Sequence, residues 1–163
     1  MLMGNPDRFA FWIERVPEWE THNYKNGLLF LFFKGELYPK ELRTTVLNSD
    51  LPTLLDGAHS PFLTPVSDAS LYALEDEALF RRIAEMAYPP DGVTGNDCSF
   101  SLPLQELNDA GYALFLLSNG QQVKYLLGRW FGNSLSLAGT VELDASEHRA
   151  IVRQMTQYSK ELR

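Results

Sequence analysis

The sequence predicts an α+β fold: a mainly antiparallel sheet built from hairpins, packed with two or three helices that include a C-terminal helix. Three observations lead to this prediction. Apolar runs flank Ser118-Asn119-Gly120, and Asn-Gly between such runs is typical of a tight hairpin turn. The run Gly27–Lys34 is continuously apolar with a turn at each end, as in a strand buried on both faces. Apolar residues from Ile151 to Leu162 repeat at helical spacing and form one stripe.

The length of the chain and the order of its elements indicate one domain. A chain of 163 residues can bury roughly 68–70% of its unfolded surface in a single core. The predicted strands come in hairpins, and the helices do not alternate regularly with them. We therefore expect residues 1–163 to form one globular domain, without internal repeats.

The N-terminal third is expected to form strands joined by tight turns. Gly4-Asn5-Pro6-Asp7 has turn chemistry and leads into an aromatic, β-branched run. A polar connection precedes the run Gly27–Lys34, and Lys34-Gly35-Glu36 then makes a second turn. The expected strands are Arg8–Val16, Gly27–Lys34, residues 37–39 and Arg43–Leu47.

Two helices and two loops are expected in the middle of the chain. Asn48-Ser49-Asp50 offers N-caps, and Pro52 suits a first helical turn, so a short helix should cover Leu51–Asp56. Residues 59–70 contain two prolines and are expected to form a loop. A second helix is expected over Leu74–Tyr88, ended by Pro89-Pro90, with a polar loop at residues 91–97.

The last third is expected to return to strands and to close with a helix. Cys98–Leu104 alternates apolar and polar residues, which is typical of a strand. The segments Gly111–Ser118 and Gln121–Gly128 should pair across the Asn-Gly turn, and Thr140–Leu143 should form a further short strand. Asp144 is expected to cap the final helix, with Glu147 completing an Asp version of the capping box.

The net charge of −7 is unevenly distributed along the chain. Residues 1–43 carry six acids and six bases, whereas residues 44–123 carry eleven acids and only two bases. Residues 124–163 carry four acids and six bases. Such an acidic middle repels phosphates, which argues against nucleic-acid binding, and favours encounter with a basic partner. The alternative is that the acids only keep the protein soluble.

No residue pattern indicates catalysis, a metal ion or a cofactor. Cys98 is the only cysteine, and its phase with Phe100 and Leu102 favours a small core residue over a nucleophile. The three histidines lie far apart and show no metal-ligand spacing. The loop at residues 91–97 lacks the spacing and the closing glutamate of a calcium loop, so a solvated turn is favoured.

The sequence also predicts a cytoplasmic protein that does not enter a membrane. No apolar run approaches the ~20 residues of a membrane helix. The start of the chain lacks a basic segment followed by an apolar core, and its turn at Gly4–Asp7 places the expected fold close to Met1. The single cysteine excludes an internal disulfide, as is usual in the cytoplasm.

Candidate contacts for a partner protein are acids and two tryptophans. Glu75-Asp76-Glu77 begins the second predicted helix, where acids also interact favourably with the helix dipole. Trp19 lies in a polar connection, where it is either an exposed binding hot spot or a lid folded onto the core. The same two interpretations apply to Trp130. The candidate contacts are Trp19, Glu75, Asp76, Glu77, Asp91, Asp97 and Trp130.

Several short motifs resemble the bacterial immunity protein 42 family, the antidotes of polymorphic toxin systems. The start of the chain, with Gly4-Asn5-Pro6 and Phe9-Ala10, is similar to the family's Met-x-x-Gly-Asn/Asp-Pro-x-x-Phe-Ala pattern. Residues 100–107, with Ser101-Leu102-Pro103-Leu104, look like the lead into the family's later hairpin. Gly128-Arg129-Trp130 looks like the tryptophan segment that follows this hairpin.

The resemblance implies a protein that binds and neutralises a cognate toxin domain and has no chemistry of its own. An acidic surface would suit a basic toxin, such as a nuclease, by steering the encounter and covering the active site. Two alternatives remain from the residues alone. One is a small cytoplasmic hydrolase whose carboxylates gather in a deep pocket, and the other is a general interaction domain with several partners. The oligomeric state is not indicated by the sequence.

Overall fold

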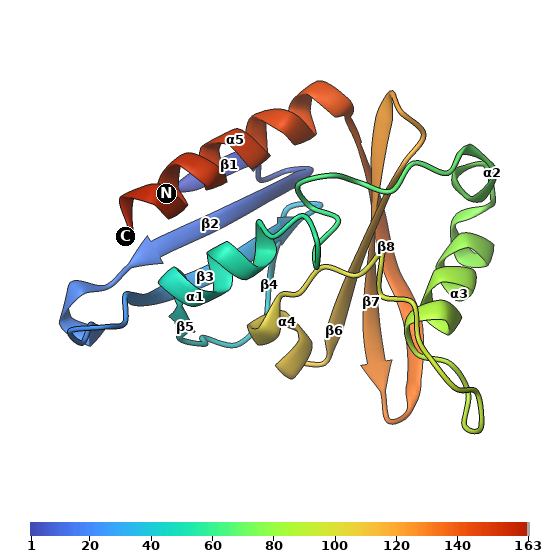
Figure 1. Cartoon of the computed structure of the whole chain (residues 1–163), viewed down its shortest axis with the longest axis horizontal. Coiled ribbons are helices and arrows are strands. Elements are labelled where there is room, and N and C mark those ends of the chain that lie inside the picture. The colour runs from blue at the N-terminus through green and yellow to red at the C-terminus, as the bar shows by residue number, and fades with distance from the viewer. Residues whose placement is uncertain (163) are drawn as a thin grey trace.

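The computed structural model describes residues 1–162 and shows an α+β fold with two antiparallel sheets, which confirms the predicted fold class. The two sheets lie side by side and are linked by the middle of the chain (Figure 1). The five-stranded sheet contains β1 (Leu2–Asn5), β2 (Phe9–Arg15), β3 (Asn26–Phe33), β4 (Glu36–Tyr38) and β5 (Thr45–Val46). The three-stranded sheet contains β6 (Tyr112–Ser118), β7 (Gln122–Phe131) and β8 (Ser134–Asp144).

The helices are unevenly distributed between the two sheets. The C-terminal helix packs beside the N-terminal strands, whereas α3 lies against the three-stranded sheet on the other side of the molecule (Figure 1). None of the helices described within residues 1–162 is both long enough and apolar enough to cross a membrane. The helices are α1 (Leu47–Leu54), α2 (Ala69–Tyr72), α3 (Asp76–Ala87), α4 (Gln105–Asp109) and α5 (Ala145–Glu161), with a 3-10 turn η1 (Pro17–Trp19).

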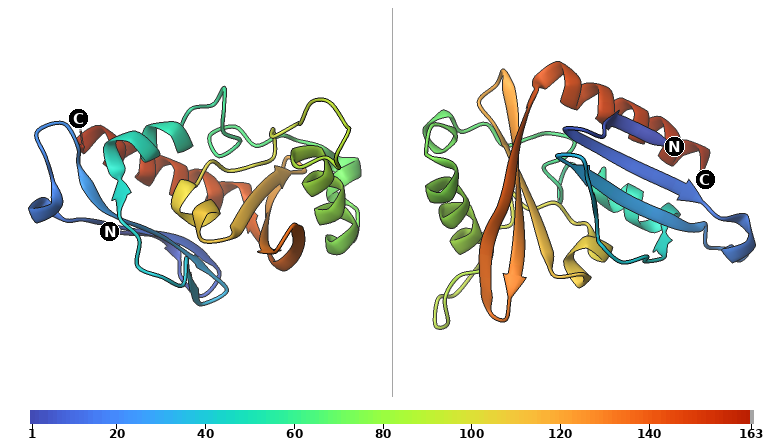
Figure 2. Two further views of the ribbon diagram at one scale, coloured as in Figure 1. Left: turned by 90° about the horizontal axis from the view of Figure 1, so that it is seen from below. Right: turned by 180° about the vertical axis from the view of Figure 1, so that it is seen from behind.

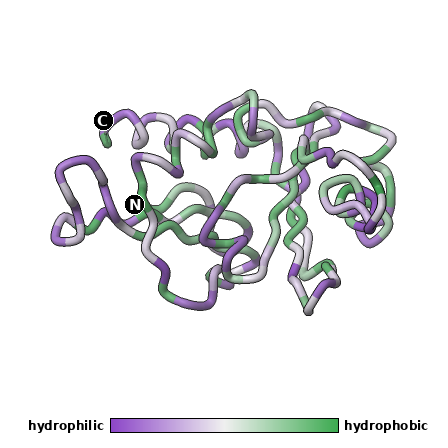
Figure 3. The backbone as a smooth tube through the Cα atoms, turned by 60° about the horizontal axis from the view of Figure 1, so that its bottom comes forward, coloured by the Kyte–Doolittle hydropathy of each residue, from purple (hydrophilic) through white to green (hydrophobic). Residues whose placement is uncertain are grey.

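Two apolar cores lie on opposite faces of the three-stranded sheet. The larger core joins the inner face of the five-stranded sheet to α1, α5 and one face of β6–β8. The smaller core lies between α3 and the other face of β6–β8. Apolar residues accordingly concentrate along the strands, while the connecting loops are mostly polar (Figure 3). The strand β6 is buried along its whole length because it contributes to both cores.

The two sheets meet at a pair of stacked aromatic rings. Phe9 on β2 and Tyr125 on β7 have ring centroids 3.9 Å apart and are both fully buried. The hydroxyl of Tyr125 shares a 2.6 Å hydrogen bond with Nδ1 of His148 on α5. This contact ties the C-terminal helix to the junction between the sheets.

Several predicted elements are confirmed, with changes in their extent. The Asn-Gly hairpin joins β6 to β7, and α3 and α5 occupy the predicted helical stretches. The backbone N–H of Asp144 donates to the Glu147 carboxylate at 2.9 Å, as the capping box predicts. The predicted strand Thr140–Leu143 is only the end of β8, because the alternating leucines at 135 and 137 continue the pairing with β7. The predicted helix Leu51–Asp56 instead starts at Leu47.

The prediction of a strand at Cys98–Leu104 is wrong. This segment makes one isolated bridge, Ser101 to Phe115, and Pro103 then interrupts it because proline has no N–H to donate. Cys98 precedes the bridge and is exposed, so its assignment to the core is also wrong. The alternation that suggested a strand instead reflects a short edge segment in which Phe100, Leu102 and Leu104 are buried.

Besides the 3-10 turn η1, three short elements were not predicted from the sequence. Strand β1 pairs with β2 across the predicted turn at residues 4–7, and helix α4 follows Pro103. Helix α2 begins inside the predicted loop, where the Asp68 carboxylate accepts a 2.9 Å hydrogen bond from the N–H of Leu71. Strand β3 also differs from its prediction, because Leu28 and Phe32 are only half-buried on the outer face of the sheet.

We expect the stability of the protein to fall as the pH decreases from about 6.5 to about 4. Burial lowers the pKa of His148 to about 4. The unfolded chain, with a histidine pKa of about 6.5, therefore binds a proton in this range while the folded chain does not. At pH about 5 this difference should reduce the free energy of unfolding by about 2 kcal/mol.

Urea unfolding at pH about 7.5 and about 5 measures this effect. The variant His148→Gln keeps a polar group near Tyr125 but does not titrate, so its loss of stability between the two pH values should be smaller by that amount. Equal losses of stability in the wild-type protein and the variant would show that His148 does not cause this pH dependence.

Candidate functional site

A groove lies between α3 and the end of the β7–β8 hairpin, and it encloses about 400 Å³. The helix approaches the sheet closely because β7 has a glycine there: a Cβ on Gly128 would lie 2.7 Å from Cζ of Phe80. Two of the residues singled out in the sequence, Glu77 and Trp130, line this groove together. The full lining is Glu77, Phe80, Arg81, Ala84, Glu85, Tyr88, Trp130, Asn133, Ser134, Leu135, Ser136 and Leu137.

Aromatic side chains form one end of the groove. The half-buried ring of Trp130 packs edge-on against Tyr88, with ring centroids 5.1 Å apart. Phe131 is 59% exposed on the opposite face of β7, where the Arg129 guanidinium lies 5.0 Å from its ring centroid, and neither residue lines the groove. Glu77, Arg81 and Glu85 line the groove beside Tyr88 and Trp130, and an aromatic centre with a charged rim is the typical composition of a protein-binding hot spot. Tyr88 was not among the predicted contacts.

The three acids at the start of α3 have different surroundings. Glu75 and Glu77 are exposed, whereas Asp76 is partly buried and accepts a 2.9 Å hydrogen bond from Nζ of Lys124 on β7. The Lys124 side chain is only 7% exposed, and its ammonium also lies 3.2 Å from the Glu142 carboxylate. Burial alone would lower the pKa of Lys124, but the hydrogen bonds to these two acids outweigh it and raise the pKa. Asp76 therefore links α3 to the sheet.

We expect Asp76→Asn to destabilise the fold by about 1 kcal/mol, because it removes one of the two negative charges next to a buried ammonium while Glu142 remains. Chemical unfolding of the variant measures this cost. An unchanged stability would contradict the internal role of Asp76.

The two remaining acids lie on the loop that follows α3. Asp91 is exposed, and Asp97 is held by its neighbours. The backbone N–H of Asp97 donates to the carbonyl of Met86 at 2.7 Å, and its carboxylate accepts from the N–H of Ser99 at 2.9 Å. The hydrogen bonds from Ser99 lower the pKa of Asp97, so this carboxylate stays charged in mildly acidic solution. Both acids thus extend the negative charge beyond the C-terminal end of α3.

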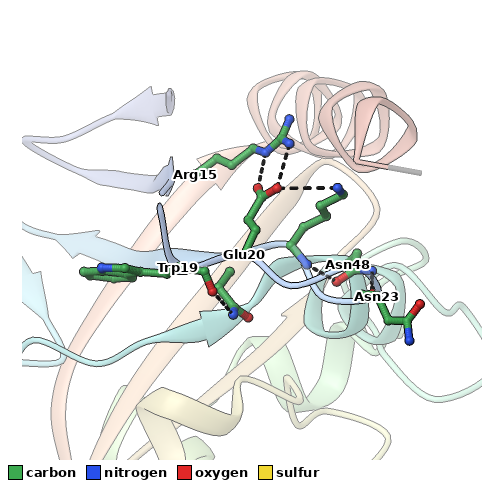
Figure 4. Close-up of polar contacts among 7 residues, drawn as sticks. Arg15, Trp19, Glu20, Asn23 and Asn48 are labelled. Atoms are coloured by element: carbon green, nitrogen blue, oxygen red, sulfur yellow. Dashed lines mark hydrogen bonds and ion pairs between the residues drawn. The ribbon is translucent and has the colours of Figure 1, made fainter. Parts of the chain in front are cut away.

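Trp19 lies at the opposite end of the molecule from the groove. It belongs to η1, in the connection between β2 and β3, whereas α3 lies at the other end of the long axis (Figures 1 and 2). The ring is 40% exposed and points away from the polar contacts of this connection (Figure 4). The structure therefore does not bring Trp19 together with Trp130 or with the acids of α3.

The connection that carries Trp19 is fixed by a network of polar contacts (Figure 4). The Glu20 carboxylate accepts hydrogen bonds from the guanidinium of Arg15, and Nζ of Lys25 lies 3.4 Å from it. The bond from Arg15, aided by Lys25, lowers the pKa of Glu20 to about 2. Asn48 on α1 accepts from the N–H of Lys25 at 2.8 Å and donates to the carbonyl of Asn23 at 3.0 Å. Glu20 is thus already paired within the chain.

A second pocket bears on the hydrolase alternative because it gathers two carboxyl groups. It lies between α1, α4 and the β3–β4 hairpin, and burial raises the pKa of both Asp50 and Glu106 beside it. Its volume is about 20 Å³, which holds about one water molecule. A substrate would not fit between these two acids.

No group of three or more His, Cys, Asp or Glu side chains within residues 1–162 is arranged to hold a metal ion. At the surface, Nδ1 of His59 lies 2.5 Å from the Asp56 carboxylate. The groove beside α3 instead combines an aromatic and an acidic lining.

Comparisons with known proteins agree with a binding function. The family model described as immunity protein 42 matches residues 1–158. The fold is similar to the crystal structure of CdiI from Burkholderia dolosa AUO158, with a TM-score of 0.76 and 28% sequence identity. The match covers 97% of this chain and 99% of that one. No curated protein sequence matches the chain. With nearly its whole length matched, the chain belongs to the immunity protein 42 family.

Proposed function

We propose that this chain neutralises a toxin of the contact-dependent inhibition type by binding the toxin domain with the surface around the α3–β8 groove. Membership of the immunity protein 42 family and similarity to CdiI support a role as an antidote. The groove supports this location of the toxin-binding surface, because Trp130 and Tyr88 lie there beside Glu77 and Glu85. On this proposal the protein acts in the cytoplasm by binding alone, without catalysis or a cofactor.

The charges around the groove support a basic partner. Glu75, Glu77 and Glu85 on α3 are exposed, and Asp91 and Asp97 continue the acidic surface along the following loop. Arg81 and Arg82 only partly offset them. Such a surface raises the association rate with a basic protein at low salt and repels nucleic acid. Many surface acids contribute to steering. Charge changes should therefore alter the association rate constant more than the dissociation rate constant.

The aromatic end of the groove supplies the short-range part of the proposed interaction. Trp130 and Tyr88 present ring edges and faces beside carboxylates, which suits an inserted arginine or lysine of the toxin. Trp19 is outside this surface, and we propose that it does not contact the same toxin domain.

The double variant Glu77→Lys/Glu85→Lys tests the charge contribution. We expect its association rate with the cognate toxin domain to fall at least about tenfold at low salt, because two attractive charges become repulsive. Stopped-flow or surface-based kinetics at several salt concentrations measures this.

The matched control is Asp7→Lys/Glu161→Lys, which reverses the same number of exposed acids away from the groove. The control should change the association rate by less than about threefold, since its charges lie outside the contact surface. Equal effects of the two double variants would show that only net charge matters and would contradict the proposed location.

A further inference from the structure

Strand β8 forms a long uncovered edge of the three-stranded sheet. It pairs with β7 from Ser134 to Asp144 and with no other strand among residues 1–162. The opposite edge of the sheet, β6, is covered, because the N–H groups of Leu116 and Ser118 donate to the carbonyls of Phe100 and Val66 at 2.9 Å. The outer backbone groups of β8 are therefore the ones that a further strand could reach.

The pairing with β7 shows which backbone groups of β8 point outward. The β7–β8 hairpin has a two-residue loop, and such a loop closes on a hydrogen-bonded pair, here the one that includes Ser134. Bonded and non-bonded pairs alternate along an antiparallel ladder, so Leu135 and Leu137 turn their N–H and C=O groups outward. Further along β8, the outward carbonyl of Glu142 accepts a 2.6 Å hydrogen bond from Arg8. No backbone group elsewhere in the described chain bonds to Leu135 or Leu137.

The α3–β8 groove runs along this edge. Its lining contains every residue from 133 to 137, although alternate side chains of a strand point to opposite faces of the sheet. A groove over one face would touch only every second residue of the strand. The unbroken run therefore indicates that the groove follows the backbone edge, where the small side chains of Ser134 and Ser136 are exposed.

Helix α3 forms the other wall of the groove and runs alongside β8 (Figure 1). The start of the helix is tied to the strand through Lys124, whose ammonium lies 2.9 Å from the Asp76 carboxylate and 3.2 Å from that of Glu142. The end of the helix lies beside the β7–β8 turn, where Tyr88 packs against Trp130. A segment in this groove would have a strand edge on one side and a helix on the other.

The charges on α3 match a particular kind of extended segment. Glu77, Arg81 and Glu85 are exposed on successive turns that line the groove, and none of them forms an ion pair within the described residues. Glu77 and Glu85 are about 12 Å apart along the helix axis. Positions i and i+4 of a strand lie on one face about 13 Å apart. Lys or Arg at these two positions, with an uncharged residue at i+2, would reach both acids and avoid Arg81.

The same charges disfavour a second copy of the chain at this edge. Two β8 edges paired about a two-fold axis would bring two α3 helices together, because the interface would contain the same surface twice. Each copy would add its own Glu77 and Glu85, and like charges that face each other weaken association. A basic segment of another protein meets no such repulsion.

We infer that the toxin domain contributes an extended segment that pairs with the outer edge of β8 and adds a fourth strand to this sheet. Its backbone bonds to the N–H and C=O groups of Leu135 and Leu137, and its basic side chains contact Glu77 and Glu85. In such strand addition the main-chain hydrogen bonds supply affinity, and alternate side chains supply specificity. The inference rests on the proposed toxin-binding function and specifies how the same groove holds its partner.

Amide hydrogen exchange followed by NMR tests the strand pairing, with the C-terminal domain of the protein encoded immediately upstream as the probe. In the free protein the outward amides of Leu135 and Leu137 should exchange readily, whereas the amide of Ser136, which bonds to β7, should be protected. Saturating toxin domain should slow exchange at Leu135 and Leu137 at least about tenfold.

The outcomes separate this inference from the proposed function. A complex that forms but leaves exchange at Leu135 and Leu137 unchanged would overturn the strand pairing and leave toxin binding intact. Protection of these two amides by self-association without toxin would assign the edge to a second copy and overturn the inference. Absence of any complex would overturn the proposed function together with the inference that rests on it.

The variant Leu137→Pro tests the same edge by affinity. It removes one outward N–H, and proline is tolerated in an edge strand where the N–H faces solvent. The matched control Leu137→Ala also shortens the side chain but keeps the N–H. Leu137→Pro should bind the toxin domain at least about 30-fold more weakly than Leu137→Ala. Equal affinities in calorimetry would contradict the pairing, and if circular dichroism shows that the proline variant is unfolded, the exchange measurement decides.

Discussion

Replacing Phe9 with alanine should reduce the free energy of unfolding by about 3–5 kcal/mol. The ring is fully buried, stacks on Tyr125 at 3.9 Å, and contacts Phe11 and Phe33 edge-on at 5.4 and 6.3 Å. Its removal leaves a cavity at the only stacked contact between β2 and β7 within the described residues, where the two sheets meet. Because the larger core spans this junction, we expect the substitution to destabilise the whole fold rather than one sheet.

Chemical unfolding monitored by far-UV circular dichroism and by tryptophan fluorescence measures the effect of Phe9→Ala. The matched variant Phe9→Leu retains most of the apolar volume and should cost less than about 2 kcal/mol. A similar loss in both variants would show that ring stacking rather than volume stabilises the junction. A loss below about 1 kcal/mol for Phe9→Ala would contradict the packing described for the two sheets.

The variant Trp130→Ala should weaken binding to the cognate toxin domain by at least about 30-fold. Removal of a central aromatic anchor from a protein interface costs about 2 kcal/mol or more, and 1.4 kcal/mol corresponds to a tenfold change in affinity. Trp130 is half-buried against Tyr88 in the free protein, so the ring is already positioned before the toxin binds. Most of the change should appear as faster dissociation.

Trp19→Ala provides the control for the loss of a tryptophan. Trp19 is exposed at the other end of the molecule, so its removal should change toxin affinity by less than about threefold. Calorimetry of both variants against the same toxin domain makes the comparison. A larger effect at Trp19 than at Trp130 would move the binding surface to the β2–β3 connection.

The elements predicted best from the sequence are those that a local pattern determines. Asn119-Gly120 produces the β6–β7 hairpin, and the apolar stripe from Ile151 to Leu162 places α5 on the larger core. The strand predicted at Cys98–Leu104 failed because alternation alone does not distinguish a strand from a short edge segment interrupted by Pro103. The division into two sheets was not predictable, since it depends on which hairpins meet across Phe9 and Tyr125.

The candidate site was predictable only in part because it forms from segments far apart in the sequence. Glu77 and Trp130 were both singled out, but only the packing of α3 on β7–β8 places them in one groove. Tyr88 was missed because its position at the end of a helix, next to Pro89, gave no sign of its contact with Trp130. Asp76 looked like its acidic neighbours, and the buried Lys124 that binds it lies on a distant strand.

The measurement that tests the central claim most directly is calorimetry with the C-terminal domain of the protein encoded immediately upstream of this chain. We predict nanomolar affinity at about 50 mM salt and clearly weaker binding at about 500 mM, because the acidic surface beside α3 attracts a basic toxin domain. Tight binding that does not change with salt would support the antidote function but contradict the proposed attraction by the acidic surface. Absence of binding at both salt concentrations would contradict the proposed pairing with this toxin.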